Sequence, residues 1–195
     1  MHLVLFGGAF DPLHNGHIDI VDHIKNTYPH DLLALVPTGQ PVHKERSFFS
    51  NDARLMMLKS VFNNYSNVVI SDYETQMKKP SYTIDTISYL EKQYSAADVS
   101  LVVGFDQLYQ FHRWRQYETI LKSCKLVVVL RKGINHDRLL RHFPEELMPY
   151  KDSITIHEVY PSEISSSRLR LMIKKGDDIC SYVPDAVVSI INQFE

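Results

Sequence analysis

The segment from Gly7 to His17 constrains this chain more than any other, because it joins an apolar run to an amphipathic one. The apolar run Leu3–Phe6 precedes it, and the segment itself is rich in glycine and contains His14 and His17. This pattern indicates a buried strand that breaks into a glycine-rich turn, followed by the start of a helix. Free N–H groups and the helix dipole at such a start attract anions, so the segment predicts a phosphate-binding site.

Short apolar runs alternate with amphipathic stretches along the 195 residues. Continuous apolar runs are typical of strands buried on both faces of a parallel sheet. We therefore predict an α/β fold with a doubly wound, Rossmann-like parallel sheet flanked by helices, forming one domain over residues 1–195. Ligands of such folds bind at the carboxyl ends of the strands. The predicted strands are Leu3–Phe6, Leu32–Val36, Val68–Ser71, Ser100–Val103, Leu126–Leu130 and Ile154–Val159.

Helices are predicted where apolar residues recur every three to four positions. Start signals support several of them, because serine, threonine and asparagine cap helices and proline favours a first turn. The predicted helices cover about 17–28, 55–62 after the start signal Ser50–Asp52, 84–94 with Thr83 as N-cap, Arg168–Ile173 after a serine cluster, and Pro184 to Phe194.

Composition narrows the classes of partner. With 21 basic residues, 23 acidic residues and a formal net charge of −2, the chain lacks the basic stripe of proteins that coat nucleic acids. It has no apolar run of about 18 residues and no charged-then-apolar leader, so we expect a cytoplasmic protein without a membrane partner. Cys124 and Cys180 lack metal-ligand spacing and are predicted to be reduced core residues.

The glycine-rich turn differs from the two common phosphate loops, since neither G-x-x-x-x-G-K-[ST] nor G-x-G-x-x-G follows the first strand. Gly7 and Gly8 allow close backbone approach to a ligand. His14 and His17, at i and i+3, can lie on one side of the first helical turn and donate N–H groups to phosphate oxygens. The alternative for His17 is a packed core histidine, because it also lies on the apolar stripe of the helix.

A second candidate anion site begins at Ile164, in the run Ile-Ser-Ser-Ser-Arg-Leu-Arg. Ser166 and Ser167 at a helix start offer hydroxyl and N–H groups, and Arg170 offers a forked donor for phosphate. For this segment taken alone, the alternative is an ordinary N-capped surface helix.

Together these two segments resemble the G-x-F-D-P-x-H-x-G-H and I-S-S-T-x-I-R signatures of the nucleotidyltransferase superfamily of adenylyl- and cytidylyltransferases. Pro80–Thr86 resembles the P-x-Y-T-x-D-T segment of bacterial nicotinate mononucleotide adenylyltransferases. Val36–Lys44 is similar to the V-P-x-x-x-P-P-H-K loop of that family, while Gly104–Asp106 and Trp114 match its G-x-D turn and its tryptophan. The resemblance spans nearly the whole chain.

The chain departs from the family pattern at two positions. Ala9 stands where the family usually has threonine or serine, which removes one hydroxyl contact to phosphate. Val42 replaces a proline in the loop motif. The backbone N–H groups of the turn and both histidines are unaffected.

The resemblance implies the nucleotidyltransferase fold and adenylyl transfer from ATP to nicotinate mononucleotide in NAD biosynthesis, with Mg²⁺ on the ATP phosphates. It implies no metal ligands from the protein, and it implies that the C-terminal helices from about 165 close the phosphate site. The implied catalytic residues are His14, His17 and Arg170. The implied ATP-binding residues are Gly7, Gly8, Ala9, Phe10, Gly16, Gly104, Asp106, Ile164, Ser166 and Ser167. The implied acceptor-binding residues are Lys44, Tyr82, Thr83 and Trp114.

The residue types in the middle of the chain suit such an acceptor. Thr83 at a helix start can present its hydroxyl and N–H groups to a pyridine carboxylate, and Trp114 can stack on a pyridinium ring. Asp106 can accept hydrogen bonds from a ribose. The alternatives are that Trp114 is an ordinary aromatic beside Phe111, that Asp106 caps the following helix, and that Lys44 is solvated.

Three other functions stay open at this point. Nicotinamide mononucleotide differs from the nicotinate acceptor only by an amide in place of a carboxylate. A pantetheine-phosphate adenylyltransferase shares the first motif, although Tyr82–Thr86 argues against it. A non-catalytic nucleotide-binding regulator has the same fold, although intact His14, His17 and Arg170 argue against it. The sequence leaves the oligomeric state open and predicts no nucleic-acid partner.

Overall fold

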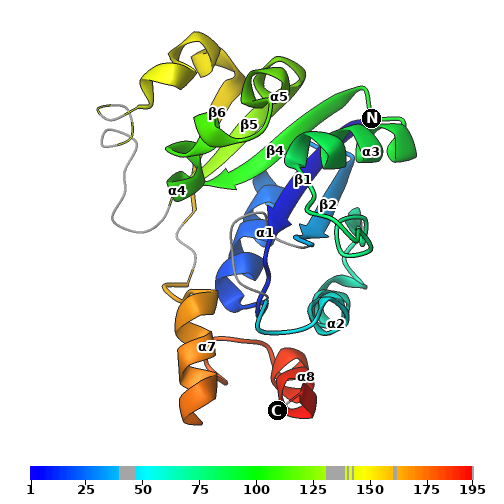
Figure 1. Cartoon of the computed structure of the whole chain (residues 1–195), viewed down its shortest axis with the longest axis vertical. Helices are drawn as coiled ribbons and strands as arrows, with labels where there is room; N and C mark the ends of the chain where they lie inside the picture. Colours follow the sequence, from blue (N-terminus) through cyan, green and yellow to red (C-terminus); the bar gives the residue numbers. More distant parts are fainter. Residues whose placement is uncertain (40–46, 131–138, 140, 142, 160–161, 195) are drawn as a thin grey trace.

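The computed structural model describes residues 1–39, 47–130, 139, 141, 143–159 and 162–194. Its centre is a parallel sheet in the order β3-β2-β1-β4-β5-β6 (Figure 1). Each predicted apolar run is a strand, and the doubly wound α/β fold is confirmed. The sheet order reverses between β1 and β4, which is where such folds bind their ligands. The strands are β1 His2–Gly8, β2 Leu32–Pro37, β3 Val68–Ile70, β4 Asp98–Gly104, β5 Cys124–Leu130 and β6 Ile154–Glu158.

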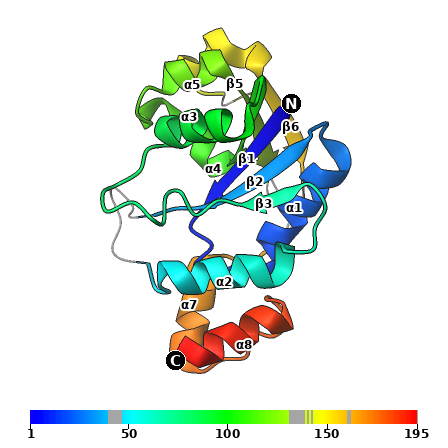
Figure 2. The same ribbon diagram turned by 90° about the vertical axis from the view of Figure 1, so that its right-hand side faces the viewer.

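Helices cover both faces of the sheet (Figure 2). One core layer contains α1 (Asn15–Thr27), α2 (Asn51–Phe62), α7 (Ser166–Lys175) and α8 (Asp185–Phe194). The other contains α3 (Thr83–Tyr94), α4 (Phe105–Leu108), α5 (Tyr117–Ser123) and the 3-10 helices η1 (Phe111–Arg113) and η2 (Glu145–Ser153). None of the helices in the described ranges is long and apolar enough to cross a membrane.

Alternation along β1 explains why its sequence is apolar throughout. Val4 and Phe6 pack into the layer of α1 and α2, whereas Leu3 and Leu5 pack into the layer of α3 and α5. Successive side chains of a strand point to opposite faces, so a central strand covered on both sides needs an apolar residue at every position.

Two helix starts differ in detail from the sequence predictions. The prediction that Thr83 is an N-cap is wrong, because α3 begins at Thr83 and Tyr82 takes the cap position. The carbonyl oxygen of Tyr82 accepts the N–H groups of Asp85 and Thr86 at 2.9 and 3.1 Å, which starts the helix one residue earlier. The Pro184 carbonyl likewise accepts backbone N–H groups, so Pro184 caps α8 from outside its first turn.

The two cysteines lie in different environments. Cys124 is buried, and burial raises the pKa of its thiol to about 11. Cys180 is exposed, so the prediction of two core cysteines is wrong for this residue. The Asp178 carboxylate accepts the Cys180 N–H at 2.9 Å in the turn between α7 and α8, which holds Cys180 at the surface.

A polar network lies between α1 and the sheet. The buried Ser100 has its Oγ 2.9 Å from the Tyr28 hydroxyl and 2.8 Å from Nε2 of His2. The Tyr28 ring meets His157 edge-on at 5.5 Å, and Nδ1 of His157 lies 3.2 Å from Nε2 of His23. Burial lowers the pKa of His2 and of His157, and for His157 the neighbouring His23 lowers it further.

These depressed pKa values predict a pH-dependent stability. The ordinary histidine pKa is 6.5, so the unfolded chain binds more protons than the folded chain as the pH falls below that value. We expect the free energy of unfolding to decrease as the pH is lowered from about 7.5 to about 5.5. His157→Gln should reduce this decrease, measured by urea denaturation at each pH. Equal decreases in the wild type and the variant would contradict the prediction.

Candidate active site

The turn after β1 begins later than the sequence predicts. β1 continues through Gly7 and Gly8, so the chain leaves the sheet at Ala9. Phe10 then adopts a left-handed φ of 48°, which is costly for a bulky residue, and complete burial of its ring offsets that cost. A Cβ on Gly8 would lie 3.1 Å from this ring. A side chain at position 8 would therefore crowd the Phe10 ring, while Gly7 and Ala9 remain exposed.

His14 and His17 lie together where α1 begins. His14 takes the N-cap position, and its carbonyl oxygen accepts the His17 N–H at 2.9 Å. The two imidazole rings stack with centroids 3.8 Å apart and planes at 27°. The Phe10 ring packs 4.9 Å from His17, which is half-buried, whereas His14 is buried. Both imidazoles thus lie at a helix N-terminus, where negative charge is favoured.

Gly16 allows the segment before α7 to approach α1. A Cβ at this position would lie 3.0 Å from the carbonyl oxygen of Ser162 and 3.2 Å from the His14 ring. Asp19 of α1 accepts hydrogen bonds from both the N–H and the hydroxyl of Ser162 at 2.8 Å. These contacts bring the two predicted anion-binding helices to the same turn.

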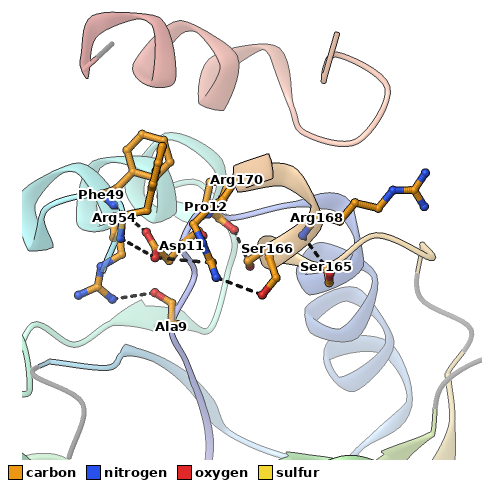
Figure 3. A network of polar contacts seen from close by, with 11 residues as sticks. Ala9, Asp11, Pro12, Phe49, Arg54, Ser165, Ser166, Arg168 and Arg170 are labelled. Atoms are coloured by element: carbon orange, nitrogen blue, oxygen red, sulfur yellow. Dashed lines mark hydrogen bonds and ion pairs between the residues drawn. The ribbon is translucent and has the colours of Figure 1, made fainter. Parts of the chain in front are cut away.

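The N-terminal part of α7 contacts that turn directly (Figure 3). The Ser166 hydroxyl donates to the carbonyl of Pro12 at 3.1 Å, and Nη1 of Arg170 donates to the carbonyl of Asp11 at 2.8 Å. Nη2 of Arg170 donates to Oγ of Ser167 at 3.1 Å. Ile164 lies in the hydrophobic core instead, with its N–H donated to the Ser162 carbonyl.

Gly104 and Asp106 lie at the carboxyl end of β4, beside the end of β1. Gly104 is the N-cap of the short helix α4, and Asp106 lies in its first turn. The alternative that Asp106 caps this helix is therefore wrong. Because β1 and β4 are neighbours, both residues lie at the edge of the sheet from which the Ala9 turn emerges.

The predicted acceptor residues Tyr82, Thr83 and Trp114 form a second group. Arg115 follows Trp114, and its guanidinium carbon lies 4.5 Å from the centre of the Tyr82 ring. Trp114 is half-buried and packs against Phe111 with ring centroids 4.8 Å apart. Thr83 follows Tyr82 as the first residue of α3. Lys44, also predicted here, lies outside the described residues.

Glu74, which the sequence did not single out, ties this second group to β2. Its carboxylate accepts hydrogen bonds from the hydroxyls of Ser81 and Thr86 at 2.7 Å each and from the Gly39 N–H at 3.4 Å. A Cβ on Gly39 would lie 2.1 Å from the Glu74 carbonyl oxygen, so no other residue fits there without a backbone shift. Glu74 therefore holds the chain after β2 against the start of α3.

Arg54 of α2 is a second functional candidate that sequence reasoning missed. It is fully buried, and Nη1 donates to the Ala9 carbonyl while Nη2 donates to Oδ1 of Asn51, both at 2.7 Å. Burial lowers the pKa of this guanidinium, and the Asp11 and Glu74 carboxylates oppose the decrease. The sequence offers one signal for this role. Arg54 lies one helical turn before the core residue Leu58 and so shares its side of the helix, and a charge buried there requires polar partners.

Comparison with known proteins identifies relatives along the whole chain. A family model described as Cytidylyltransferase-like matches residues 5–172. A Clostridium tetani protein named "Probable nicotinate-nucleotide adenylyltransferase" is 32% identical over 191 residues, covering 97% of this chain and 96% of that protein. A Nitratiruptor protein of the same name is 33% identical over 194 residues, covering 100% of this chain and 98% of that protein.

A solved structure has the same fold. It is described as Plasmodium falciparum nicotinic acid mononucleotide adenylyltransferase complexed with NaAD. Its TM-score is 0.79 at 19% identity, with 99% of this chain and 95% of that chain covered. At this identity the likeness concerns the arrangement of strands and helices.

The buried Arg54 gives a stability prediction. Arg54→Met removes the donors to Ala9 and Asn51, and charged hydrogen bonds of this kind contribute about 1.5–3 kcal/mol each, so we expect a loss of about 2–4 kcal/mol after the packing of Met is allowed for. Lys59→Met on the exposed side of α2 is the matched control and should change stability by less than about 0.5 kcal/mol. Urea denaturation measures both, and equal effects would contradict the role given to Arg54.

Proposed function

The chain belongs to the cytidylyltransferase-like family and, within it, to the nicotinate-nucleotide adenylyltransferases, and from this membership we propose its reaction. ATP and nicotinate mononucleotide give nicotinate adenine dinucleotide and pyrophosphate, a step of NAD biosynthesis (EC 2.7.7.18). The observation that carries the proposal is that the N-terminal ends of α1 and α7 meet at one turn at the end of β1. Two helix N-termini with two histidines and an arginine suit a polyphosphate.

The chemistry requires positioning and charge neutralisation more than proton transfer. The phosphate of the acceptor is already anionic and attacks the α-phosphorus of ATP in line, so the mechanism uses no general base. His14 and His17 contact the phosphates around the α-position. Ser166, Ser167 and Arg170 hold the β- and γ-phosphates as negative charge develops on the leaving pyrophosphate. A guanidinium has five N–H donors, so Arg170 can bind phosphate while its contact with the turn persists.

The remaining predicted residues divide between ATP and the acceptor. The backbone from Gly7 to Phe10, together with Gly16, lines the ATP phosphates. Gly104 and Asp106 bind the ATP ribose. Ile164 supports the ATP site from the hydrophobic core. Tyr82, Thr83 and Trp114 bind the pyridine ring and its carboxylate. The N–H groups of Thr83 and Ile84 support this assignment, because the first two N–H groups of a helix precede the first intrahelical hydrogen bond, which here begins at Asp85. Lys44 is likewise assigned to the acceptor, and it lies outside the described residues.

A divalent cation accompanies ATP in this chemistry, and we propose Mg²⁺ for that role. Among residues 1–39, 47–130, 139, 141, 143–159 and 162–194, no group of three or more His, Cys, Asp or Glu side chains is close enough to hold a metal ion. Mg²⁺ keeps several waters and binds substrate phosphates readily, so a cation carried by the ATP phosphates suits this reaction. A cytoplasmic location, where ATP is abundant, is part of the same proposal.

A comparison of acceptors tests the proposed function. The protein is incubated with ATP, Mg²⁺ and one of three acceptors: nicotinate mononucleotide, nicotinamide mononucleotide or phosphopantetheine. We expect pyrophosphate release with the nicotinate acceptor to exceed release with either other acceptor by at least about tenfold, because a site that binds the carboxylate leaves polar groups unpaired with the amide. Release with another acceptor only would overturn the choice of substrate. No release with any acceptor would favour the non-catalytic regulator.

His17 provides a second test. We expect His17→Ala to lower kcat by about 10²–10³, the usual cost of one preorganised donor to developing charge. His30→Ala, a histidine beside Tyr28 in the segment between α1 and β2, is the matched control and should keep wild-type turnover. Circular dichroism checks that both variants remain folded. A folded His17→Ala variant with more than about a tenth of wild-type kcat would contradict the catalytic role.

A further inference from the structure

Asp11 is a buried carboxylate in the turn after β1 to which the proposed reaction gives no role. It joins three segments that are far apart in the sequence (Figure 3). Oδ2 accepts the Phe48 N–H and Oδ1 accepts the Phe49 N–H, each at 2.8 Å. Nη1 of Arg170 lies 3.7 Å from Oδ2 while it donates to the main-chain carbonyl of Asp11 at 2.8 Å.

The two N–H groups fix the direction of the carboxylate. Phe49 is 3% exposed and packs in the core, so the chain at this point is held by its side chain as well as by Asp11. Two hydrogen bonds from a fixed backbone leave the carboxylate little freedom to rotate. Burial of a carboxylate is costly unless its oxygens are bonded and opposite charge is near, and here both conditions are met.

Two arginines provide that opposite charge, but only one of them can reach a ligand. Arg54 is fully buried and holds the neighbouring Ala9 carbonyl at 2.7 Å. Arg170 has 30% of its side chain exposed and lies between Asp11 and Ser167. The carboxylate therefore lies near a fully buried arginine and a second arginine whose side chain is 30% exposed.

We propose that Asp11 is a positioning residue that orients Arg170 for the β- and γ-phosphates of ATP and the leaving pyrophosphate. The inference rests on the proposed function, which gives Arg170 its phosphate contact. Asp11 acts through Arg170 and does not itself meet the substrate, because its carboxylate oxygens face backbone N–H groups and the guanidinium. Without the negative charge, Arg170 keeps the Asp11 carbonyl and Ser167 as acceptors but loses the ion-pair partner that limits its orientation.

Asp11→Asn is the variant that removes this charge with the smallest change of shape. An asparagine offers one oxygen in place of two, so it satisfies one of the two N–H groups and places an NH₂ beside donors. We expect the KM for ATP, and the KM for pyrophosphate in the reverse reaction, to rise about tenfold. The KM for nicotinate mononucleotide should change less than about twofold, because the acceptor does not bind Arg170.

A double-mutant cycle with Arg170→Ala separates orientation from general support of the fold. If Asp11 acts through Arg170, Asp11→Asn should have little further effect on the KM for pyrophosphate once the guanidinium is gone. Asp31→Asn is the matched control, because that carboxylate also accepts a backbone N–H, from His2 at 2.7 Å, at the other end of β1. It should leave the KM values of all three substrates unchanged.

Phe48→Pro provides a second variant that keeps Asp11 in place, in case Asp11→Asn does not fold. Proline has no N–H group, so this change removes the donor to Oδ2 of Asp11, the oxygen paired with Arg170. The Phe48 side chain is 40% exposed, which makes the position suitable for substitution. It should raise the KM for pyrophosphate in the same selective way but by a smaller factor.

The outcomes distinguish failure of the positioning role of Asp11 from failure of the proposed function. Equal rises in the KM values of pyrophosphate and nicotinate mononucleotide, or additive effects of Asp11→Asn and Arg170→Ala, would overturn the positioning role and leave Asp11 as a structural residue. A wild-type protein that releases no pyrophosphate would instead overturn the proposed function.

Discussion

The rest of the site depends on how the carbonyl groups of the turn after β1 are satisfied. The carbonyl oxygens of Ala9, Asp11 and Pro12 accept hydrogen bonds from side chains rather than from backbone N–H groups. Their donors come from α2 on one side and from α7 on the other. Asp11 and Pro12 are buried, where an unpaired backbone carbonyl is costly, and their donors come from α7. Arg54 of α2 adds a charged donor to the carbonyl of the exposed Ala9, so both helices stabilise the shape of the turn. The first strand and the C-terminal part of the chain are thereby joined at the proposed phosphate site.

Carboxylates also hold the described residues on either side of residues 40–46. Glu74 accepts the Gly39 N–H before residues 40–46, and Asp11 accepts the Phe48 and Phe49 N–H groups after them. Each carboxylate also contacts a residue of the proposed site. Glu74 accepts a hydrogen bond from Thr86 of α3, in the proposed acceptor half, and Asp11 pairs with Arg170 of α7, in the proposed phosphate half. Gly39 and the Phe48–Phe49 segment are thus fixed to different halves of the proposed site. The hydrogen bonds of both carboxylates, and the ion pair of Asp11 with Arg170, fix the chain on either side of residues 40–46.

Local sequence patterns predicted the strands and the starts of several helices, because those features depend on neighbouring residues. The continuous apolar run Leu3–Phe6 is sufficient to identify a strand covered on both faces, and Ser50 caps α2 as its position before Asn51 suggests. The roles of Arg54 and Glu74 were not predictable in this way, since their partners lie 45 and 35 residues away at Ala9 and Gly39. The N-cap position of Tyr82 was not predictable either, because its carbonyl oxygen makes the capping contacts and every residue type has that oxygen.

The strand order explains why the two halves of the site can cooperate although they come from distant segments. The proposed phosphate half follows β1, the proposed acceptor half includes residues after β4 and at the start of α3, and β1 and β4 are neighbours in the sheet. The distance between the ends of β1 and β4 is therefore set by parallel strands with a fixed register, and the start of α3 is held by the hydrogen bond from Thr86 to Glu74. An in-line displacement depends on holding donor and acceptor within a narrow range of distance and angle, and a sheet edge maintains such a range better than flexible segments do.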